Sequence, residues 1–178
     1  MLELILGGAR SGKSRYAEQR TSGHVDAIYI ATATAGDEEM RQRIESHRRD
    51  RNNEQGPRWN TVEEPIQLAR ILREHASDSG FILVDCLTLW LTNLLLHADA
   101  NVFARERAAL LKTLPTLPGH IVLVSNEVGQ GVVPMNKLSR RFVDESGRLH
   151  QDIAALAQRV VFVTAGLPQV LKDTPNGI

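Results

Sequence analysis

The sequence is poor in the features that mark secreted, disulfide-bonded or membrane-spanning proteins. Cys86 is the only cysteine among the 178 residues, which excludes an intramolecular disulfide and a cysteine-rich zinc site. No apolar run is long enough to cross a bilayer, because the longest, Leu87–Leu96, is interrupted by threonine and asparagine. The first residues lack the basic start and the long apolar stretch of a signal peptide. We therefore expect a cytoplasmic protein without a membrane span.

An excess of charge of one sign is also missing. The 21 basic and 21 acidic side chains cancel, so no global field attracts nucleic acid or anionic lipid. We expect no nucleic-acid partner, and any anion chemistry must be local. The length fits one domain, residues 1–178, which is long enough to bury a core of its own.

Short apolar runs alternate along the chain with longer helical patterns. Most runs are continuously hydrophobic, which is typical of parallel strands that are covered on both faces. Strands are expected at Leu2–Leu6, Ala27–Ala31, Phe81–Val84, Ile121–Val124 and Val160–Val163. Helices are expected at Gly12–Arg20, Asp37–Arg49, Pro65–Ala76, Thr88–His97, Phe103–Leu114 and Lys137–Gln158. The alternation predicts an α/β fold with three layers and a mostly parallel central sheet.

Two stretches are predicted to be irregular. Asp50–Trp59 is polar and contains glycine and proline, so it is interpreted as an exposed loop. Gly166–Ile178 contains two prolines and is expected to fray.

The strongest motif is "GGARSGKS", which fits the phosphate-binding pattern G-x-x-x-x-G-K-[ST]. An apolar strand leads into it and a helical pattern follows, as a P-loop requires. The motif consists of Gly7, Gly8, Ala9, Arg10, Ser11, Gly12, Lys13 and Ser14. Its backbone N–H groups can surround phosphate oxygens, Lys13 can reach the β- and γ-phosphates, and the Ser14 hydroxyl suits Mg²⁺. The fold is therefore predicted to be of the P-loop NTPase type.

A P-loop site usually needs a carboxylate at the end of a neighbouring strand to hold the metal's water shell. Asp85 follows the apolar run Phe81–Val84 and fits this role, although it could instead cap the following helix.

Two segments resemble GTPase motifs. Asn136–Ser139, "NKLS", lacks the carboxylate that reads guanine, and Asp144–Gly147, "DESG", lies inside a helical pattern. Both are rejected on context.

His47 lies within an arginine-rich helical pattern, "MRQRIESHRRDR". Met40 and Ile44 share its helix face, so the imidazole points inward or toward a cleft. This helix alone favours a hydrogen-bonded structural histidine on an amphipathic helix. The functional alternative is a neutral imidazole that attacks a phosphate while arginines neutralise the developing charge. Nearby arginines lower the pKa of a histidine, which favours the neutral, nucleophilic ring.

Three further segments could border a ligand. Tyr29–Thr34 ends a strand in small residues and hydroxyls, a plausible rim for a nucleotide. Glu63 and Glu64 could hydrogen-bond a base or ribose, or only charge the first turn of a helix. Asn126 and Glu127 follow the fourth expected strand, at the sheet edge where ligands bind in open α/β folds, or they simply form a strand-to-helix turn.

Ordered blocks over nearly the whole chain resemble a known family. They are "ILGGARSGKSRYAE", "YIATA", "DEEMRQRIESHRRDR", "WNTVEEP", "VDCLTLWLTNLL" and "VSNEVGQGVVPMNKLSRRFVDESGRLHQDIA". Together they are similar to the bifunctional adenosylcobinamide kinase/adenosylcobinamide-phosphate guanylyltransferases of cobalamin biosynthesis. The resemblance implies phosphorylation of the aminopropanol hydroxyl of adenosylcobinamide with ATP or GTP. It also implies transfer of GMP from GTP, through a guanylylated histidine, to adenosylcobinamide phosphate.

The resemblance also implies site residues. His47 takes the position of the guanylylated histidine, Lys13 is catalytic, and Mg²⁺ is held by Ser14 and Asp85. The implied GTP contacts are Gly7–Ser14, Ala31, Thr32, Ala33, Arg48, Arg49, Asp50, Arg51, Glu63 and Asp85. The link from His47 to Trp59 is longer than the family's usual connection.

A homotrimer is implied as well, and the apolar helical pair around Trp90 and Leu94–Leu96 is a candidate interface. The rival interpretations are a kinase of single function for another small alcohol, with a structural His47, and a nucleotide-binding regulatory module.

Overall fold

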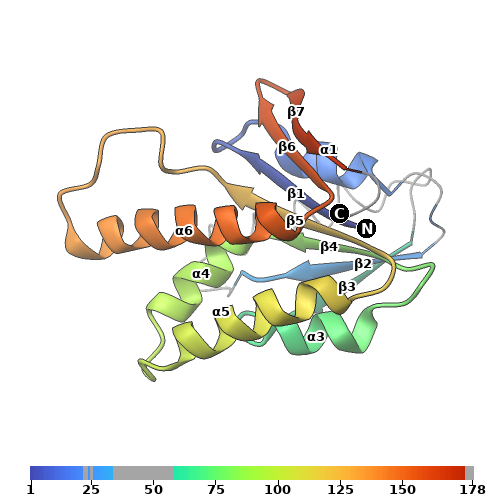
Figure 1. Cartoon of the computed structure of the whole chain (residues 1–178), viewed down its shortest axis with the longest axis horizontal. Coiled ribbons are helices and arrows are strands. Elements are labelled where there is room, and N and C mark those ends of the chain that lie inside the picture. Colours follow the sequence, from blue (N-terminus) through green and yellow to red (C-terminus); the bar gives the residue numbers. More distant parts are fainter. Residues whose placement is uncertain (22–23, 25, 34–57, 175–178) are drawn as a thin grey trace.

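The computed structural model describes residues 1–21, 24, 26–33 and 58–174, and these residues form one sheet flanked by helices (Figure 1). The strands are β1 (Leu2–Gly7), β2 (Asp26–Ala31), β3 (Arg58–Glu63), β4 (Phe81–Asp85), β5 (His120–Asn126), β6 (Arg159–Thr164) and β7 (Leu167–Asp173). Their order across the sheet is β3-β2-β4-β5-β1-β6-β7. Only β7 is antiparallel to its neighbour, which confirms the predicted α/β class and the mostly parallel sheet.

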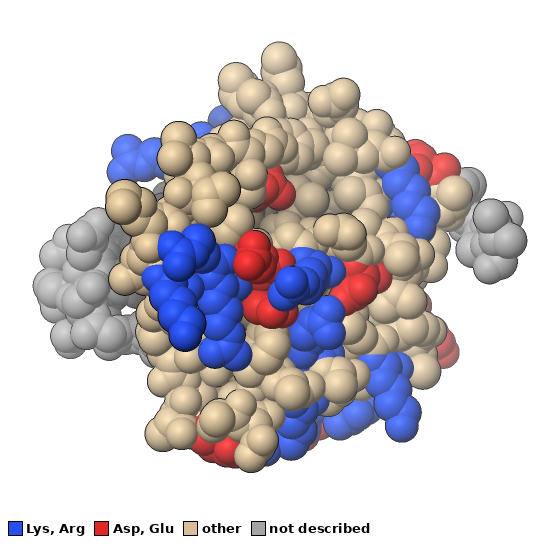
Figure 2. Space-filling model, turned by 60° about the vertical axis from the view of Figure 1, so that its left-hand side comes forward, with Lys and Arg blue, Asp and Glu red and all other residues tan. Residues whose placement is uncertain are grey.

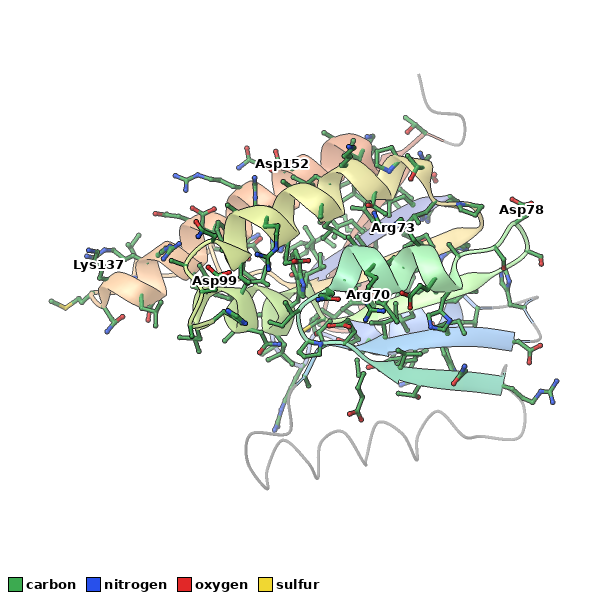
Figure 3. All side chains as sticks on the ribbon, turned by 90° about the horizontal axis from the view of Figure 1, so that it is seen from below. Arg70, Arg73, Asp78, Asp99, Lys137 and Asp152 are labelled. Atoms are coloured by element: carbon green, nitrogen blue, oxygen red, sulfur yellow. The ribbon has the colours of Figure 1, made fainter. Side chains whose placement is uncertain are left out.

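Helices cover both faces of the sheet. They are α1 (Lys13–Gln19), α3 (Leu68–His75), α4 (Leu87–Leu95), α5 (Val102–Thr113) and α6 (Lys137–Leu156), with a short 3₁₀ helix at Leu114–Thr116. Helices α3 to α6 pack on one face, as Figure 3 shows from below, and α1 packs on the other. Leu4 and Leu6 of β1 belong to the first core and Ile5 to the second, and all three are buried. Burial on both faces is why the strand sequences are continuously apolar.

The predicted helices other than Asp37–Arg49, which lies outside the described residues, are all present. Helices α4 and α5 lie between β4 and β5 in the chain, and "DESG" is part of α6. Within the part of the chain that is described, no helix is both long and apolar enough to span a membrane.

The strands at the two edges of the sheet were not predicted from the sequence. Arg58 and Trp59, expected in a loop, begin β3, and the Trp59 ring packs edge-on against Tyr29 at 5.9 Å between ring centroids. The chain after Gly166 does not fray at once, because Leu167–Asp173 pairs with β6 as β7. Both strands lie at sheet edges, where exposed polar residues and a proline such as Pro168 are tolerated. The apolar signal of a buried strand is therefore absent from their sequences.

The candidate interface on α4 is also corrected. Trp90 and Leu94 are 0% and 2% exposed and belong to the core, so they cannot contact a second copy. The Trp90 indole N–H donates to the Ile66 carbonyl at 2.8 Å, which satisfies the one polar group of this buried ring. Leu96, just after the helix, is 64% exposed and remains on the surface.

Candidate nucleotide site

The described part of the predicted site gathers at one edge of the sheet, where the parallel strands end. Gly7 at the end of β1 lies opposite Asn126 at the end of β5. Ala31 at the end of β2 lies opposite both Glu63 and Asp85. In an open parallel sheet this carboxyl edge is where ligands bind, because the connecting loops diverge there.

The loop from Gly8 to Gly12 connects β1 to α1 in a conformation that depends on glycine. A Cβ on Gly7 would lie 2.5 Å from both Ser11 Oγ and the Val163 carbonyl oxygen, so no side chain fits. Gly12 has a φ of +94°, which side-chain-bearing residues rarely adopt. Ser11 Oγ is buried and has no hydrogen-bond partner among the described residues, as expected of a polar group that awaits a ligand.

Lys13 begins α1 directly above this loop. The residue is only 8% exposed, and its Nζ donates to the Gly8 carbonyl at 3.1 Å. The ammonium group is therefore held over the loop rather than extended into solvent. Ser14 is half-buried beside it, whereas Ala9 and Arg10 at the crest of the loop are exposed.

The hairpin between β6 and β7 braces the phosphate loop. The Gly166 N–H donates to the Ser11 carbonyl at 2.8 Å, and Gly166 Cα lies 3.1 Å from the position of a Cβ on Gly12. The C-terminal strand that the sequence did not predict thus supports the motif that it predicted most strongly.

Asp85 ends β4, but β4 is not the neighbour of β1. Strand β5 lies between them, so the two strand ends are about 10 Å apart at the usual spacing of ~4.8 Å per strand. The sequence prediction of an adjacent strand was wrong. A hydroxyl and a carboxylate are oxygen donors of the kind that Mg²⁺ takes, and Mg²⁺ usually keeps several waters, so Ser14 and Asp85 fit the ion across this gap. No group of three or more His, Cys, Asp or Glu residues within the described ranges could hold a metal by itself.

Thr32 fastens the end of β2 to the end of β4. Its hydroxyl donates to the Cys86 carbonyl at 2.6 Å and accepts from the Cys86 N–H at 3.0 Å. Asn93 of α4 donates to the Thr32 carbonyl at 2.8 Å. Thr32 is completely buried, so its side chain fixes Asp85 and Ala31 in place rather than lining the site, whereas Ala33 is half-buried.

Replacing Thr32 with valine should keep the shape and remove this connection. The buried Cys86 N–H would lose its acceptor, so we expect the free energy of unfolding to fall by about 1–3 kcal/mol. Urea unfolding measures the change. The matched control is Thr116→Val, because the Thr116 hydroxyl bonds the Thr113 carbonyl on an exposed turn, and a loss of under about 0.5 kcal/mol is expected there. Equal losses in the two variants would contradict the structural role of Thr32.

Cys86 is not a nucleophile at this edge. Burial, with a smaller contribution from the Asp85 carboxylate, raises the pKa of its thiol to about 11. The thiol is therefore protonated near neutral pH, and the reactive thiolate is absent.

The two glutamates after β3 differ in their surroundings. Glu64 Oε1 accepts from the backbone N–H groups of Ile66 and Gln67, and Oε2 pairs with Arg70 at 2.9 Å. Glu64 therefore stabilises the start of α3, which is one of the two roles that the sequence left open, rather than facing a ligand. Glu63 is exposed at the sheet edge beside Ala31, where a ligand can reach it.

Asn136 also has a structural role, which agrees with the sequence-based conclusion that it does not read guanine. Its side-chain oxygen accepts from the Leu138 and Ser139 N–H groups and caps α6. His47, Arg48, Arg49, Asp50 and Arg51 lie outside the described residues, so their predicted roles stay predictions.

Three polar residues at this edge were not predicted from the sequence: Ser125 and His150, which are buried, and Thr88, which is half-buried. They come from α4, β5 and α6 and contact one another only in the folded chain. No local motif marks them. The polar Ser125 at the end of an otherwise apolar strand was the one available signal.

A parallel sheet with a glycine-rich loop, a lysine and a serine at the end of β1, and an acidic residue at the end of β4, defines a P-loop nucleotide-binding protein. The family model described as "Cobinamide kinase / cobinamide phosphate guanyltransferase" matches residues 3–171. The chain belongs to this family.

Full-length relatives agree with this assignment. The chain is 56% identical over 176 residues to the "Bifunctional adenosylcobalamin biosynthesis protein CobP" of Pseudomonas aeruginosa, covering 98% of this chain and 99% of that one. It is 36% identical over 185 residues to the corresponding CobU protein of Escherichia coli, covering 97% and 100%. A solved structure from Pyrococcus horikoshii is similar with a TM-score of 0.53 at 10% identity, covering 97% of this chain and 86% of that one, which supports the fold alone.

Proposed function

We propose that this chain, as one domain of residues 1–178, phosphorylates the aminopropanol hydroxyl of adenosylcobinamide and then transfers GMP to the product. The observation that carries the proposal is the built phosphate cradle, Gly7–Ser14 with Lys13 held over it, in a member of the cobinamide kinase and guanyltransferase family. A free, buried Cys86 fits the reducing cytoplasm as its location.

In the kinase step, the substrate hydroxyl oxygen attacks the γ-phosphorus of ATP or GTP. The new O–P bond forms as the bond from the γ-phosphorus to the β–γ bridging oxygen breaks, and the nucleoside diphosphate leaves with the electron pair. Lys13 and the loop N–H groups stabilise the negative charge on the phosphate oxygens. Mg²⁺ at Ser14 and Asp85 would neutralise charge on the β- and γ-phosphates when bound.

In the transfer step, the neutral His47 imidazole attacks the α-phosphorus of GTP and pyrophosphate leaves. An oxygen of adenosylcobinamide phosphate then attacks the same phosphorus, the P–N bond breaks, and the imidazole is restored. The covalent intermediate divides one nucleotidyl transfer into two displacements. Arg48, Arg49 and Arg51 would neutralise the phosphate charge and keep the ring unprotonated.

To test the proposal, purified protein is incubated with adenosylcobinamide, GTP and Mg²⁺, and two products are measured separately. We expect nucleoside diphosphate when the hydroxyl substrate is present, and pyrophosphate when GTP is added to the phosphorylated substrate. Diphosphate without pyrophosphate would identify a kinase of single function. Nucleotide binding without either product would identify a regulatory module and overturn the proposal.

An apolar groove beside the site is proposed to receive the corrinoid. It has a volume of about 390 Å³ and lies between α4, the loop after β5 and α6. Its apolar lining includes Leu95, Leu96, Val128, Leu138, Phe142 and Val143. The loop segment that borders it begins just after Asn126, which pairs with Gly7, so the groove adjoins the reacting edge. Figure 2 turns this side of the molecule forward and shows basic and acidic side chains close together, next to uncharged surface.

The corrin ring has a broad, methyl-bearing periphery, which an apolar groove can bind by excluding water. Leu138→Gln is therefore expected to raise the KM for adenosylcobinamide about tenfold and to leave the KM for GTP unchanged, since removing one apolar contact costs about 1.5 kcal/mol. The matched control is Leu171→Gln on β7, since Leu171 is 56% exposed and Leu138 is 46% exposed. A change in native mass without a change in KM would instead identify the groove as an interface between copies, such as those of the implied trimer.

A further inference from the structure

A chain of polar side chains, buried at Ser125 and His150 and half-buried at Thr88, connects three elements at the carboxyl edge, and the reaction steps above do not use it. Thr88 Oγ1 lies 3.3 Å from Ser125 Oγ, which lies 2.8 Å from His150 Nε2. On the other side of the ring, His150 Nδ1 lies 3.6 Å from Glu127 Oε2. Ser125 and His150 are 1% and 6% exposed. Burying such groups is costly, so a chain of them at a reactive edge requires an explanation beyond packing.

The polar contacts of this chain lead from Thr88 toward Glu127. Thr88 Oγ1 accepts from the Asn126 N–H at 2.7 Å, so its own proton can be donated to Ser125. Burial lowers the pKa of His150, although the Glu127 carboxylate acts in the opposite direction, so the ring is neutral near pH 7. A neutral ring that accepts from Ser125 at Nε2 carries its proton on Nδ1, facing Glu127. Glu127 is therefore the carboxylate that this N–H faces, at 3.6 Å, a distance slightly longer than a hydrogen bond.

One oxygen of Glu127 is held by a hydrogen bond and the other lies near His150. Oε1 accepts from the Gly129 N–H at 2.5 Å, and a Cβ on Gly129 would come within 3.0 Å of the same oxygen. Oε2 faces His150. The side chain is 19% exposed, so the carboxylate is mostly sheltered but still reachable. This combination is unlike that of a freely solvated surface glutamate.

Glu127 also occupies the central position along the edge. Its N–H donates to the carbonyl of Gly7, the first residue of the phosphate loop, at 3.0 Å. It follows β5, the strand between β1, which leads to Lys13, and β4, which ends at Asp85. A carboxylate here lies between the phosphate cradle and the proposed metal carboxylate, and it borders the groove through Val128.

We propose that Glu127 is the general base of the kinase step and that His150 is its positioning residue. This inference rests on the proposed phosphoryl transfer. As the substrate hydroxyl oxygen forms its bond to the γ-phosphorus, the hydroxyl proton passes to a Glu127 carboxylate oxygen, and the nucleoside diphosphate leaves with the electrons of the broken bond. The guanylyl transfer needs no such base, because imidazole and phosphate attack without losing a proton.

The test compares Glu127→Gln with the wild type in the two reactions. The amide keeps the size and can still accept from Gly129, but it cannot take a proton. We expect the kinase kcat to fall about 100-fold or more, with the KM for adenosylcobinamide changed less than threefold. Pyrophosphate release from GTP with pre-formed adenosylcobinamide phosphate should stay within threefold. The control is Glu145→Gln on α6, whose carboxylate pairs with Arg148 at 2.7 Å, and neither reaction should change.

Variants of His150 test the positioning role. His150→Leu should lower the kinase kcat about tenfold while guanylyl transfer is retained, and His150→Gln, whose amide keeps an N–H near Glu127, should restore part of the loss. Equal kinase rates in Glu127→Gln and wild type would overturn the proposal, as would a parallel loss of both reactions. If the wild type does not phosphorylate adenosylcobinamide, the proposed function fails. In that case the rate of nucleotide hydrolysis, in which water is the phosphoryl acceptor, is measured instead. Glu127→Gln must then lower this hydrolysis rate relative to the wild type.

Discussion

His47→Ala is expected to remain unlabelled after incubation with GTP radiolabelled at the α-phosphate, whereas wild-type protein retains the label. The wild-type label should be lost in acid, because a phosphoramidate P–N bond is acid-labile. Guanylyl transfer to adenosylcobinamide phosphate should fall by about 1,000-fold or more, since the variant lacks the group that forms the covalent bond. Label retained on denatured protein and pyrophosphate release together measure both effects.

The kinase step should survive in His47→Ala, because it uses the cradle and not the imidazole. The matched control is His97→Ala, which removes an exposed histidine from the connection between α4 and α5 and should label as wild type does. Equal labelling of His47→Ala and wild type would exclude His47 as the nucleophile. It would return His47 to the structural role that its own helix pattern favours.

Lys13→Met is expected to abolish both reactions. Lys13 is buried over the phosphate loop, and methionine fills a similar volume without the charge, so the fold should persist. Loss of one positioned charge at a phosphoryl site typically costs about 100- to 1,000-fold in kcat. We expect a decrease of this size in diphosphate formation and in pyrophosphate release, both measured at saturating GTP. Urea unfolding of the variant checks that the fold persists.

Lys112→Met is the control, because this lysine lies on the exposed side of α5 and should affect neither reaction. The pattern across variants is itself informative: His47→Ala removes one reaction and Lys13→Met removes both. That pattern would show that a single nucleotide cradle serves the kinase and the guanylyltransferase. If Lys13→Met kept either reaction above a tenth of the wild-type rate, a second nucleotide site would be required.

The sequence by itself determined the features that depend on contiguous residues. The phosphate loop could be predicted because Gly7, Gly12, Lys13 and Ser14 must stand at fixed spacing between a strand and a helix, and the structure has that arrangement. The central strands could be predicted because burial on both faces leaves continuous apolar runs. Family membership also followed from ordered blocks along the chain, and it is shown by the match over residues 3–171.

Tertiary structure decided which of these pieces are neighbours. The sheet order placed β5 between β1 and Asp85, and no local pattern encodes strand order. Edge strands β3 and β7 escaped prediction because one exposed side removes the apolar signal, yet the β7 hairpin braces the phosphate loop through Gly166.

The polar contacts at the site show the same division. Thr32 and Cys86 are 54 residues apart in sequence, and Ser125 and His150 are 25 apart, so each pair is brought together only by packing of whole elements. A threonine, a serine and a histidine have no distinctive pattern when read singly. Local spacing therefore specified the cradle that holds phosphate. Long-range packing supplied Thr32, which fixes the sheet edge, and the polar chain from Thr88 to His150 that faces the Glu127 carboxylate.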